Sequence, residues 1–260
     1  MGERTQYTPG TFSWTDLTTP DQESAKVFYA GLFGWEYDDS PVGENMVYSM
    51  ATLSGRNVAA ISPQPEQQRE AGAPPAWNSY VTVEDADATL ARARELGATV
   101  HADAFDVMDA GRMGVIQDPQ GAYILPWQPK ENIGAGLVNA PGALSWNELG
   151  SPDPDASARF YGDLFGWTTT PMEGADPPYQ VIQTAAGRAN GGIRPPMPPG
   201  TPPFWLVYFA TDDLDGTLAK VGEHGGTVLM PATDIGIAKI AVGQDPQGAV
   251  FALYAGQLED

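Results

Sequence analysis

The chain has 260 residues, of which 42% are hydrophobic and 10% aromatic, so it carries enough apolar material for packed cores and is not a disordered chain. Its formal net charge of −20, with only 13 lysines and arginines, would repel nucleic-acid phosphates and anionic membranes. The sequence has no cysteine, which excludes disulfides, thiolate metal ligands and a cysteine nucleophile.

The amino-terminal ten residues lack the apolar stretch of a signal peptide, and no apolar run reaches the length of a membrane span. We therefore expect a cytoplasmic protein that binds neither nucleic acid nor membrane. A monomer and a homodimer are both compatible with the sequence.

The first predicted elements are a strand and a helix in residues 10–35. Polar and apolar residues alternate before Asp21, as they do in a half-buried strand. Asp21 can cap a helix whose apolar residues recur at helical spacing as far as Phe33. Gly34 then stands where helices commonly end in a left-handed turn.

Two strands follow, at residues 48–53 and 57–61, and then a polar, proline-rich loop at 62–75. The next strand is predicted at 77–83. Asp85 or Asp87 can cap a second helix, which ends at Gly97. Two or three further strands are divided by a turn at 118–121, so the order strand, helix, strands occurs twice.

The same order then starts again. Residues 142–167 repeat residues 10–35 at an offset of 132, with twelve of the 26 positions identical. Farther along, Tyr179 matches Tyr48, and the turn at 245–248 matches the turn at 118–121. We predict domain 1 at residues 7–129, a linker at 130–141 and domain 2 at 142–257, because repeats of this length indicate duplicated domains.

Both domains share the motifs Pro-Asp, Phe-Tyr and Leu-Phe-Gly-Trp, followed later by Asp-Pro-Gln-Gly-Ala. This pattern resembles the vicinal oxygen chelate superfamily of glyoxalases, bleomycin resistance proteins and ring-cleaving dioxygenases. It is most similar to a two-domain actinobacterial branch whose members are described as glyoxalase-like or hydroxylase-like. The resemblance implies an α+β fold with two tandem glyoxalase-like domains, each made of two βαβββ units that form a cupped mixed sheet.

In metal-dependent members of that superfamily, four strands each supply one His, Gln or Glu ligand. The corresponding positions here are occupied by Trp14, about Ala60, Asn78 and Leu125 in domain 1, and by Trp146, about Gly192, Leu206 and Ala252 in domain 2. The only histidines, His101 and His224, fall at non-equivalent places in the two repeats, where surface or helix-end roles account for them. We therefore expect no metal and no cofactor, which disfavours a metal-dependent glyoxalase or dioxygenase.

Strand alternation predicts which residues share the face of the former ligands. These positions are Phe12, Trp14, Asp16, Thr18, Asn78, Tyr80, Thr82, Tyr123, Leu125 and Trp127 in domain 1, and Leu144, Trp146, Glu148, Leu206, Tyr208, Ala210, Val250, Ala252 and Tyr254 in domain 2. Such a surface suits a flat or bulky organic ligand. The alternative is that these aromatic side chains fill the cup as core.

Asp16 and Glu148 match across the repeat and are candidate catalytic residues. A carboxylate in an apolar cup has its pKa raised by desolvation, which suits a general acid or base. The alternatives are a solvated rim position, or a structural pairing with Arg112 or Lys239. Those two basic residues are also matched, and they either bind a ligand oxygen or remain in solvent.

The candidate ligand-binding residues are thus Trp14, Asn78, Tyr80, Arg112, Tyr123, Trp127, Trp146, Tyr208, Lys239 and Tyr254. The leading hypothesis is a metal-free protein that binds an aromatic or polyketide-like molecule for sequestration, delivery or resistance in specialised metabolism, a role implied by the resemblance. The alternative is a cofactor-independent isomerase, lyase or hydrolase that uses Asp16 or Glu148. A third possibility is that one domain only supports the other.

Overall fold

The computed structural model describes residues 2–42, 46–196 and 198–258, which form two mixed sheets of eight strands each. The sheet of domain 1 has the order β3-β4-β5-β2-β6-β9-β8-β7. Its strands are β2 (Phe12–Thr19), β3 (Glu36–Pro41), β4 (Val47–Leu53), β5 (Arg56–Pro63), β6 (Ala76–Thr82), β7 (Thr99–Val107), β8 (Gly111–Gln117) and β9 (Tyr123–Pro129).

Domain 2 repeats this plan with the order β12-β13-β14-β11-β15-β18-β17-β16. Its strands are β11 (Leu144–Gly150), β12 (Thr168–Pro171), β13 (Gln180–Gln183), β14 (Ala189–Arg194), β15 (Phe204–Ala210), β16 (Thr227–Asp234), β17 (Ala238–Gln244) and β18 (Val250–Gly256). In each sheet the first strands of the two βαβββ units lie side by side and antiparallel at the centre. The predicted fold class is confirmed.

Four helices cross over from the first strand of each unit, and each begins at an aspartate cap. They are α1 (Gln22–Phe33), α3 (Ala86–Glu95), α4 (Pro154–Phe165) and α5 (Leu214–Glu223). The capping side chains of Asp21, Asp85, Asp153 and Asp213 each accept a backbone N–H three residues later. Gly34 and Gly166 end α1 and α4 with φ of 72° and 73°, in the left-handed region that glycine adopts without strain.

The sequence pattern missed four short elements. The strand β3 lies at a sheet edge with mostly exposed residues, so it shows no apolar alternation. The helix α2 (Glu66–Glu70) has no buried residue and lies within the proline-rich loop. Near the amino terminus, β1 (Gly2–Glu3) pairs with β10 (Leu137–Val138) in the linker.

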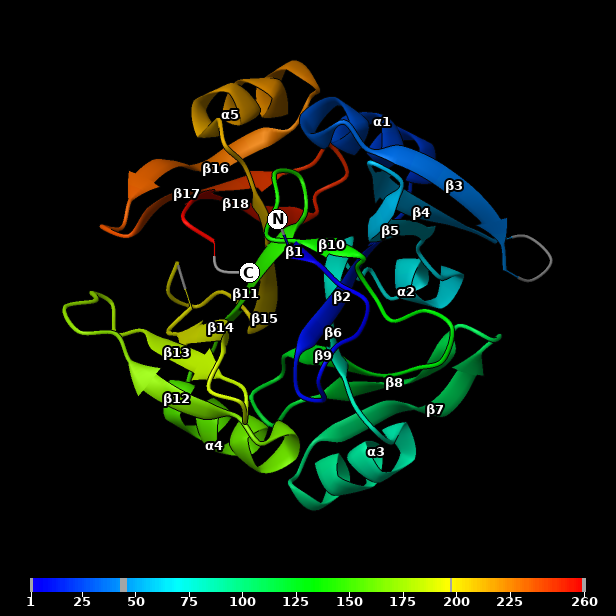
Figure 1. Ribbon diagram of the computed structural model, residues 1–260, viewed down its shortest axis with the longest axis vertical. Coiled ribbons are helices and arrows are strands. Elements are labelled where there is room, and N and C mark those ends of the chain that lie inside the picture. The colour runs from blue at the N-terminus through cyan, green and yellow to red at the C-terminus, as the bar shows by residue number, and fades with distance from the viewer. Residues whose placement is uncertain (1, 43–45, 197, 259–260) are drawn as a thin grey trace.

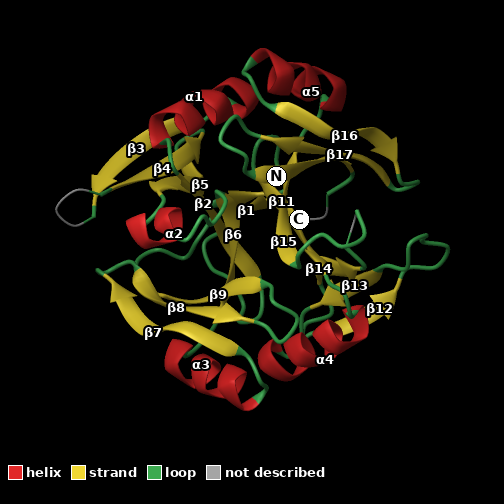
Figure 2. Ribbon diagram, turned by 180° about the vertical axis from the view of Figure 1, so that it is seen from behind, coloured by secondary structure: helices red, strands yellow, loops and turns green. Residues whose placement is uncertain are grey.

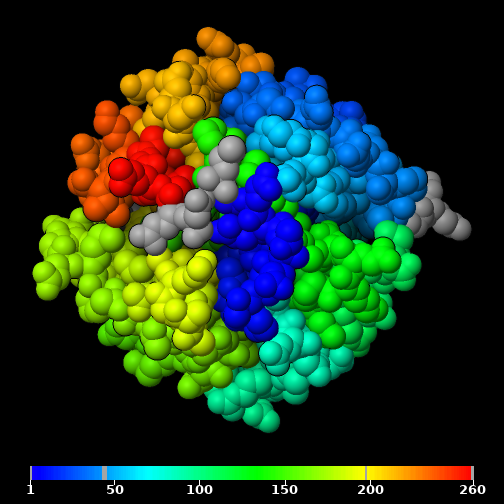
Figure 3. Space-filling view, viewed as in Figure 1, coloured from blue at the N-terminus to red at the C-terminus, as the bar shows by residue number. Residues whose placement is uncertain are grey.

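The two sheets stand back to back, and their concave faces open to opposite sides (Figure 1). The four helices α1, α3, α4 and α5 lie on the convex faces at the outer edge of the molecule, with α1 beside α5 and α3 beside α4 (Figures 1 and 2). At the centre, Ser79 of β6 donates a 2.7 Å hydrogen bond to Asn147 of β11. The amino-terminal segment crosses the face shown in Figure 3, between the two domains.

Aromatic side chains fill the two spaces between the domains. On the side of α1 and α5, Trp35 and Trp77 each pack against Phe209 with ring centroids 5.5 and 5.0 Å apart. On the side of α3 and α4, Phe12 packs against Trp205 with a centroid separation of 5.0 Å. Edge-to-face pairs of this kind add to the hydrophobic stabilisation of the interface.

The placement of Phe12 and Leu144 on the concave faces is wrong. The register of β2 against β6 shifts between Phe12 and Trp14, and that of β11 against β15 shifts between Leu144 and Trp146. One extra residue in a strand reverses the alternation of all side chains before it. Phe12 and Leu144 therefore point into the core between the domains.

None of the helices in the described residues has the length and hydropathy of a membrane-spanning segment.

Candidate functional site

The concave face of domain 1 is centred on a buried hydrogen-bond network around Asp16. We call this face cup 1 and define it by Trp14, Asp16, Tyr48, Asn78, Tyr80, Leu125 and Trp127. The amide of Asn78 donates to Oδ1 of Asp16 over 2.8 Å, and the hydroxyl of Tyr80 donates to Oδ2 over 2.8 Å. The register of β2 and β6 places Asp16 directly opposite Asn78 and so assembles these donors.

Tyr48 extends the network toward a tryptophan. Its hydroxyl donates to Oδ2 of Asp16 over 3.1 Å and accepts the indole N–H of Trp14 over 3.0 Å. Burial raises the pKa of Asp16 above its ordinary value, although the hydrogen bonds from Asn78, Tyr80 and Tyr48 act in the opposite direction. Burial, together with the nearby Asp16, also raises the pKa of Tyr80.

Cup 1 is filled by its own side chains. Trp14 is 4% exposed, and Tyr80 and Trp127 are each 6% exposed. The indole N–H of Trp127 donates to the carbonyl of Asn132 over 2.9 Å, so the linker is anchored to this strand. A side chain buried to this degree contributes packing but has little surface left for a ligand.

The concave face of domain 2 holds a carboxylate at the equivalent position but surrounds it differently. We call this face cup 2 and define it by Trp146, Glu148, Tyr179, Arg194, Leu206, Tyr208, Ile240, Val242, Ala252 and Tyr254. Nε of Arg194 donates to Oε1 of Glu148 in an ion pair, and the two side chains are 19% and 7% exposed. Leu206 stands where domain 1 has Asn78, so one neutral donor is replaced by hydrocarbon.

Two tyrosines flank this ion pair. Burial and the charge of Glu148 raise the pKa values of Tyr179 and Tyr208, so both phenols keep their protons at neutral pH. The hydroxyl of Tyr179 accepts the indole N–H of Trp146 over 2.9 Å, as Tyr48 does with Trp14.

A glycine makes room for Tyr179. A Cβ at Gly192 would lie 1.9 Å from the Tyr179 hydroxyl oxygen, far inside van der Waals contact. Gly192 pairs with Glu148 in the register of β11 and β14, which brings this hydroxyl to the strand that carries the carboxylate. The absent side chain at Gly192 therefore allows the phenol to reach the floor of cup 2.

Cup 2 is less completely filled than cup 1. Trp146, Ile240, Val242 and Tyr254 are only partly buried, and they pack around the buried cluster of Leu206, Tyr208 and Ala252. The smaller Ala252 and Tyr254 replace Leu125 and Trp127 of cup 1. Cup 2 thus presents partly exposed aromatic and aliphatic walls above a buried charged pair, which is how binding sites for organic ligands are built.

The structure does not bring Arg112 or Lys239 to the carboxylates. Arg112 forms a bidentate pair with Asp87 of α3 at 2.7 and 3.0 Å, on the convex face of the sheet. Lys239 is exposed beside Ile240, whose side chain points into cup 2, so strand alternation turns Lys239 to the other face. The structural pairing of Asp16 or Glu148 with these two basic residues is therefore wrong: tyrosines and Asn78 surround Asp16, and Arg194 pairs with Glu148.

The two remaining candidates lie at the periphery of the cups. Tyr123 is 47% exposed at the start of β9, and its ring packs on His101 with a centroid distance of 5.1 Å. Tyr254 is partly buried, and its hydroxyl donates to the carbonyl of Gln257 over 3.3 Å. The structure therefore brings together Trp14, Asp16, Asn78, Tyr80 and Trp127 in one domain and Trp146, Glu148, Tyr208 and Tyr254 in the other.

The residues at the four metal-ligand positions implied by the resemblance do not fit a divalent ion in either domain. Indole, methyl, amide and isobutyl groups occupy them in cup 1, and indole, hydrogen, isobutyl and methyl groups occupy them in cup 2. Divalent transition metals are bound chiefly by imidazole, carboxylate and thiolate groups, and the one amide at these positions, that of Asn78, is engaged with Asp16. Across residues 2–42, 46–196 and 198–258, no three His, Cys, Asp or Glu side chains gather closely enough to hold an ion.

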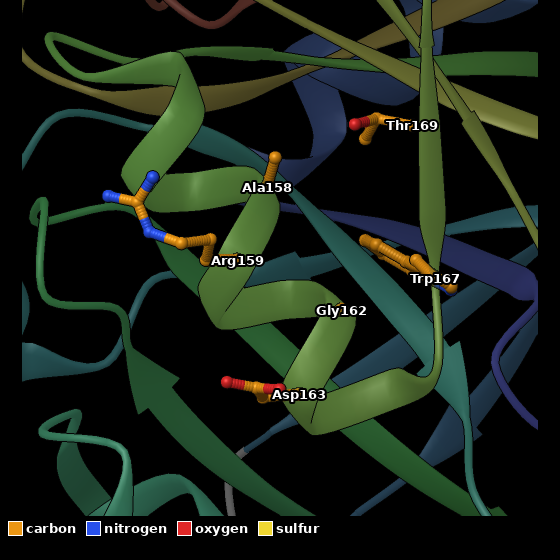
Figure 4. A pocket seen from close by; sticks show the side chains of 6 residues that line it. All are labelled: Ala158, Arg159, Gly162, Asp163, Trp167 and Thr169. Carbon is orange, nitrogen blue, oxygen red and sulfur yellow. The ribbon is translucent and has the colours of Figure 1, made fainter.

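Two shallow depressions lie elsewhere on the surface. One is formed by α4 and β12 and is lined by Ala158, Arg159, Gly162, Asp163, Trp167 and Thr169 (Figure 4). The other lies beside the β16–β17 turn and includes Lys239. Apart from Lys239, neither depression contains a candidate site residue.

Sequence reasoning missed three side chains of the two cups. Tyr48 and Tyr179 match across the repeat, and this match was the available signal for both. Arg194 had no such signal, because domain 1 has Ser62 at the corresponding position. The parallel pairing of β14 with β11 places Arg194 opposite Gly150, two residues from Glu148, where the two side chains form their ion pair.

Comparisons with known proteins agree with this architecture. A family model described as Glyoxalase/Bleomycin resistance protein/Dioxygenase superfamily matches residues 11–124 and 143–253. The chain is 47% identical to "Putative glyoxylase CFP32" of Mycobacterium tuberculosis over 97% of each chain. It is 31% identical to "Anthracycline biosynthesis protein DnrV" of Streptomyces peucetius, over 96% of this chain and 94% of the relative.

Among solved structures, the Mn(II)-bound glyoxalase from Novosphingobium aromaticivorans superposes with a TM-score of 0.66 at 17% identity, covering 96% of this chain and 83% of that chain. An identity this low shows the fold alone. The chain belongs to the glyoxalase/bleomycin resistance protein/dioxygenase superfamily, as its motifs indicated.

Proposed function

We propose that this protein binds a planar aromatic molecule in cup 2, without a metal ion, and that domain 1 chiefly supports domain 2. The observation that carries the proposal is the difference between the two cups. Trp14 and Trp127 are buried in domain 1, whereas their counterparts Trp146 and Tyr254 remain partly exposed in domain 2, together with Ile240 and Val242. Aromatic walls supply a large contact area at a small cost in side-chain entropy.

The relatives support an aromatic polyketide as the ligand class. Two proteins named for anthracycline biosynthesis are 31% identical to this chain across nearly its whole length. Anthracyclines contain fused planar rings, which can stack on an aromatic side chain such as that of Trp146. Sequestration, delivery or resistance in specialised metabolism is the role we assign to such binding.

Tryptophan fluorescence tests this proposal with 1,8-dihydroxyanthraquinone as the probe. Binding in cup 2 should quench the emission of Trp146 and saturate. Trp146→Leu should weaken the affinity roughly tenfold, because the loss of a large aromatic contact costs on the order of 1.5 kcal/mol or more. Trp14→Phe in cup 1 is the matched control and should leave the affinity unchanged. Equal losses in the two variants would contradict the assignment to cup 2.

One observation favours a catalytic role as a second candidate. Glu148 is buried in cup 2 beside two phenols that keep their protons, an arrangement that can move a proton to or from a bound ligand. A cofactor-independent isomerase, lyase or hydrolase would then use Glu148 as the base. Glu148→Gln should abolish turnover of a bound ligand while affinity falls far less, and a ligand recovered unchanged from wild-type protein would leave binding as the function.

A further inference from the structure

Arg194 has more hydrogen-bond donors than the structure satisfies. It is the last residue of β14, and its Nε donates to Glu148. Its Nη1 is buried and has no hydrogen-bond acceptor among the described residues. A guanidinium carries five N–H donors and no acceptor, and leaving such a donor buried without a partner is costly.

The two cups differ in the hydrogen-bond donors that surround the buried carboxylate. In cup 1, Asp16 accepts from three neutral donors, Asn78, Tyr80 and Tyr48, and no cation takes part. In cup 2, Leu206 removes the donor equivalent to Asn78, and Arg194 adds a planar set of donors in its place. Cup 2 therefore has an excess of donors over acceptors.

This excess defines the complementary atom on a ligand. It is an acceptor, and an oxygen suits the planar edge of a guanidinium. Because Glu148 already neutralises the charge of Arg194, the pair offers an uncharged keto oxygen a donor without demanding a second negative charge. The Arg194 side chain keeps 19% of its surface exposed, and Trp146 and Tyr254 of the same cup are also only partly buried.

We propose that Arg194 recognises a keto oxygen on the aromatic ring system of the cup 2 ligand, and that it thereby selects quinones and aryl ketones over hydrocarbons of the same shape. This inference rests on the proposed function of cup 2 and adds the chemical group, a keto oxygen, that the site recognises. The ligand lies flat against Trp146, and its keto oxygen accepts from the guanidinium that Glu148 holds in place.

Two probes test the selection: 9,10-anthraquinone and anthracene, each with the same short, uncharged oligoethylene glycol chain at C2 for solubility. They share ring number and planarity and differ in the keto oxygens. Wild-type protein should bind the anthraquinone about tenfold more tightly, the size expected for one hydrogen bond from a charged donor. The double variant Glu148→Leu/Arg194→Met removes the pair together, so that no buried charge is left alone. It should bind both probes equally.

Two further variants make the comparison specific. Arg188→Met removes an exposed arginine from the same domain and should keep the preference. Arg194→Lys keeps a positive charge beside Glu148 but removes the planar edge of donors. The ratio of its affinities for the anthraquinone and the anthracene should therefore fall toward one. This variant serves as the test if the double variant does not fold. Equal binding of both probes by wild type, or a preference retained in the double variant, would overturn the inference while aromatic binding stands. Failure of wild type to bind either probe would overturn the proposed function and the inference together.

Discussion

The hydroxyl of Tyr161, on α4 of domain 2, donates a 2.8 Å hydrogen bond to Oδ2 of Asp118, in the Asp-Pro turn of domain 1. The reverse contact also exists, since Tyr29 on α1 of domain 1 donates to Oδ2 of Asp245 over 3.1 Å. Each tyrosine also accepts an indole N–H, from Trp205 and Trp77 respectively. The two most prominent sequence motifs, Phe-Tyr and Asp-Pro, are thus connected across the domain boundary.

The first prediction concerns this connection. Tyr161→Phe leaves buried Asp118 without its hydroxyl donor and the indole of Trp205 without its acceptor, so the free energy of unfolding should fall by about 1–3 kcal/mol. Tyr29→Phe should act similarly at Asp245. Urea unfolding followed by fluorescence measures both. Tyr123→Phe, which alters an exposed ring in domain 1, is the control, and an unchanged stability in both buried variants would show that the contacts are dispensable.

The second prediction is a pH dependence that Asp16 imposes on stability. Burial raises its pKa in the folded protein above the value of 3.8 for the free carboxyl. The folded state therefore holds this proton to a higher pH than the unfolded chain does, and the contribution of Asp16 to stability declines as the pH rises from 3.8 through the raised pKa. The free energy of unfolding of wild type, measured relative to that of Asp16→Asn, should therefore fall as the pH rises through this range.

A neighbouring carboxyl on the surface supplies the opposite sign as a control. The ion pair with Arg112 lowers the pKa of Asp87, so stability from that group is present above the ordinary pKa and is lost as the pH falls. Urea titrations at several pH values between about 2 and 8 compare each asparagine variant with wild type. The same slope for Asp16→Asn and Asp87→Asn would refute the opposite assignments.

The third prediction concerns Gly192. Gly192→Ala places a methyl group where the Tyr179 hydroxyl now lies, so the phenol must leave the floor of cup 2. Overpacking of this kind costs about 1–3 kcal/mol. Because the indole of Trp146 loses its acceptor as well, affinity for an aromatic probe should fall. Gly222→Ala, in α5 where a Cβ meets no atom and φ is not positive, is the matched control for adding a methyl group.

The fourth prediction separates the two matched tryptophans. Trp14→Ala should destabilise the protein by about 3–5 kcal/mol, because its side chain is 4% exposed and its loss leaves a cavity. Trp146→Ala should cost less stability but more affinity, since this ring is only partly buried. Thermal unfolding measures the stability of both variants, and titration with the aromatic probe measures their affinities. Losses in the same proportion would mean that the two cups do equivalent work.

Local chemistry in the sequence was sufficient for much of this fold. The aspartate caps, the helix-ending Gly34 and Gly166, and the doubling of the strand-helix plan all follow from short patterns. The extra residue in β2 has no such pattern, and it moved Phe12 from the cup to the interdomain core. Likewise, helical spacing placed Tyr161 on a buried face but carried no information that its partner belongs to the other domain.

The candidate site residues were likewise predictable only in part. Matching positions in the repeat identified Trp14, Asp16 and their counterparts, because both copies retain them. Arg194 came from a position where the copies differ, and its approach to Glu148 depends on parallel strand pairing between residues 46 positions apart. Long-range pairing of this kind is set by the whole sheet and not by neighbouring residues.

The crossed tyrosine–aspartate contacts also bear on how such a chain can change over generations. A substitution of the tyrosine in the helix of one domain removes a hydrogen bond from the aspartate in the turn of the other domain. The two copies of the repeat are therefore constrained together. Separating the two domains would part these donors from their acceptors on both sides at once. Each domain therefore supplies a tyrosine donor to the Asp-Pro turn of the other, and each stabilises the fold of its partner.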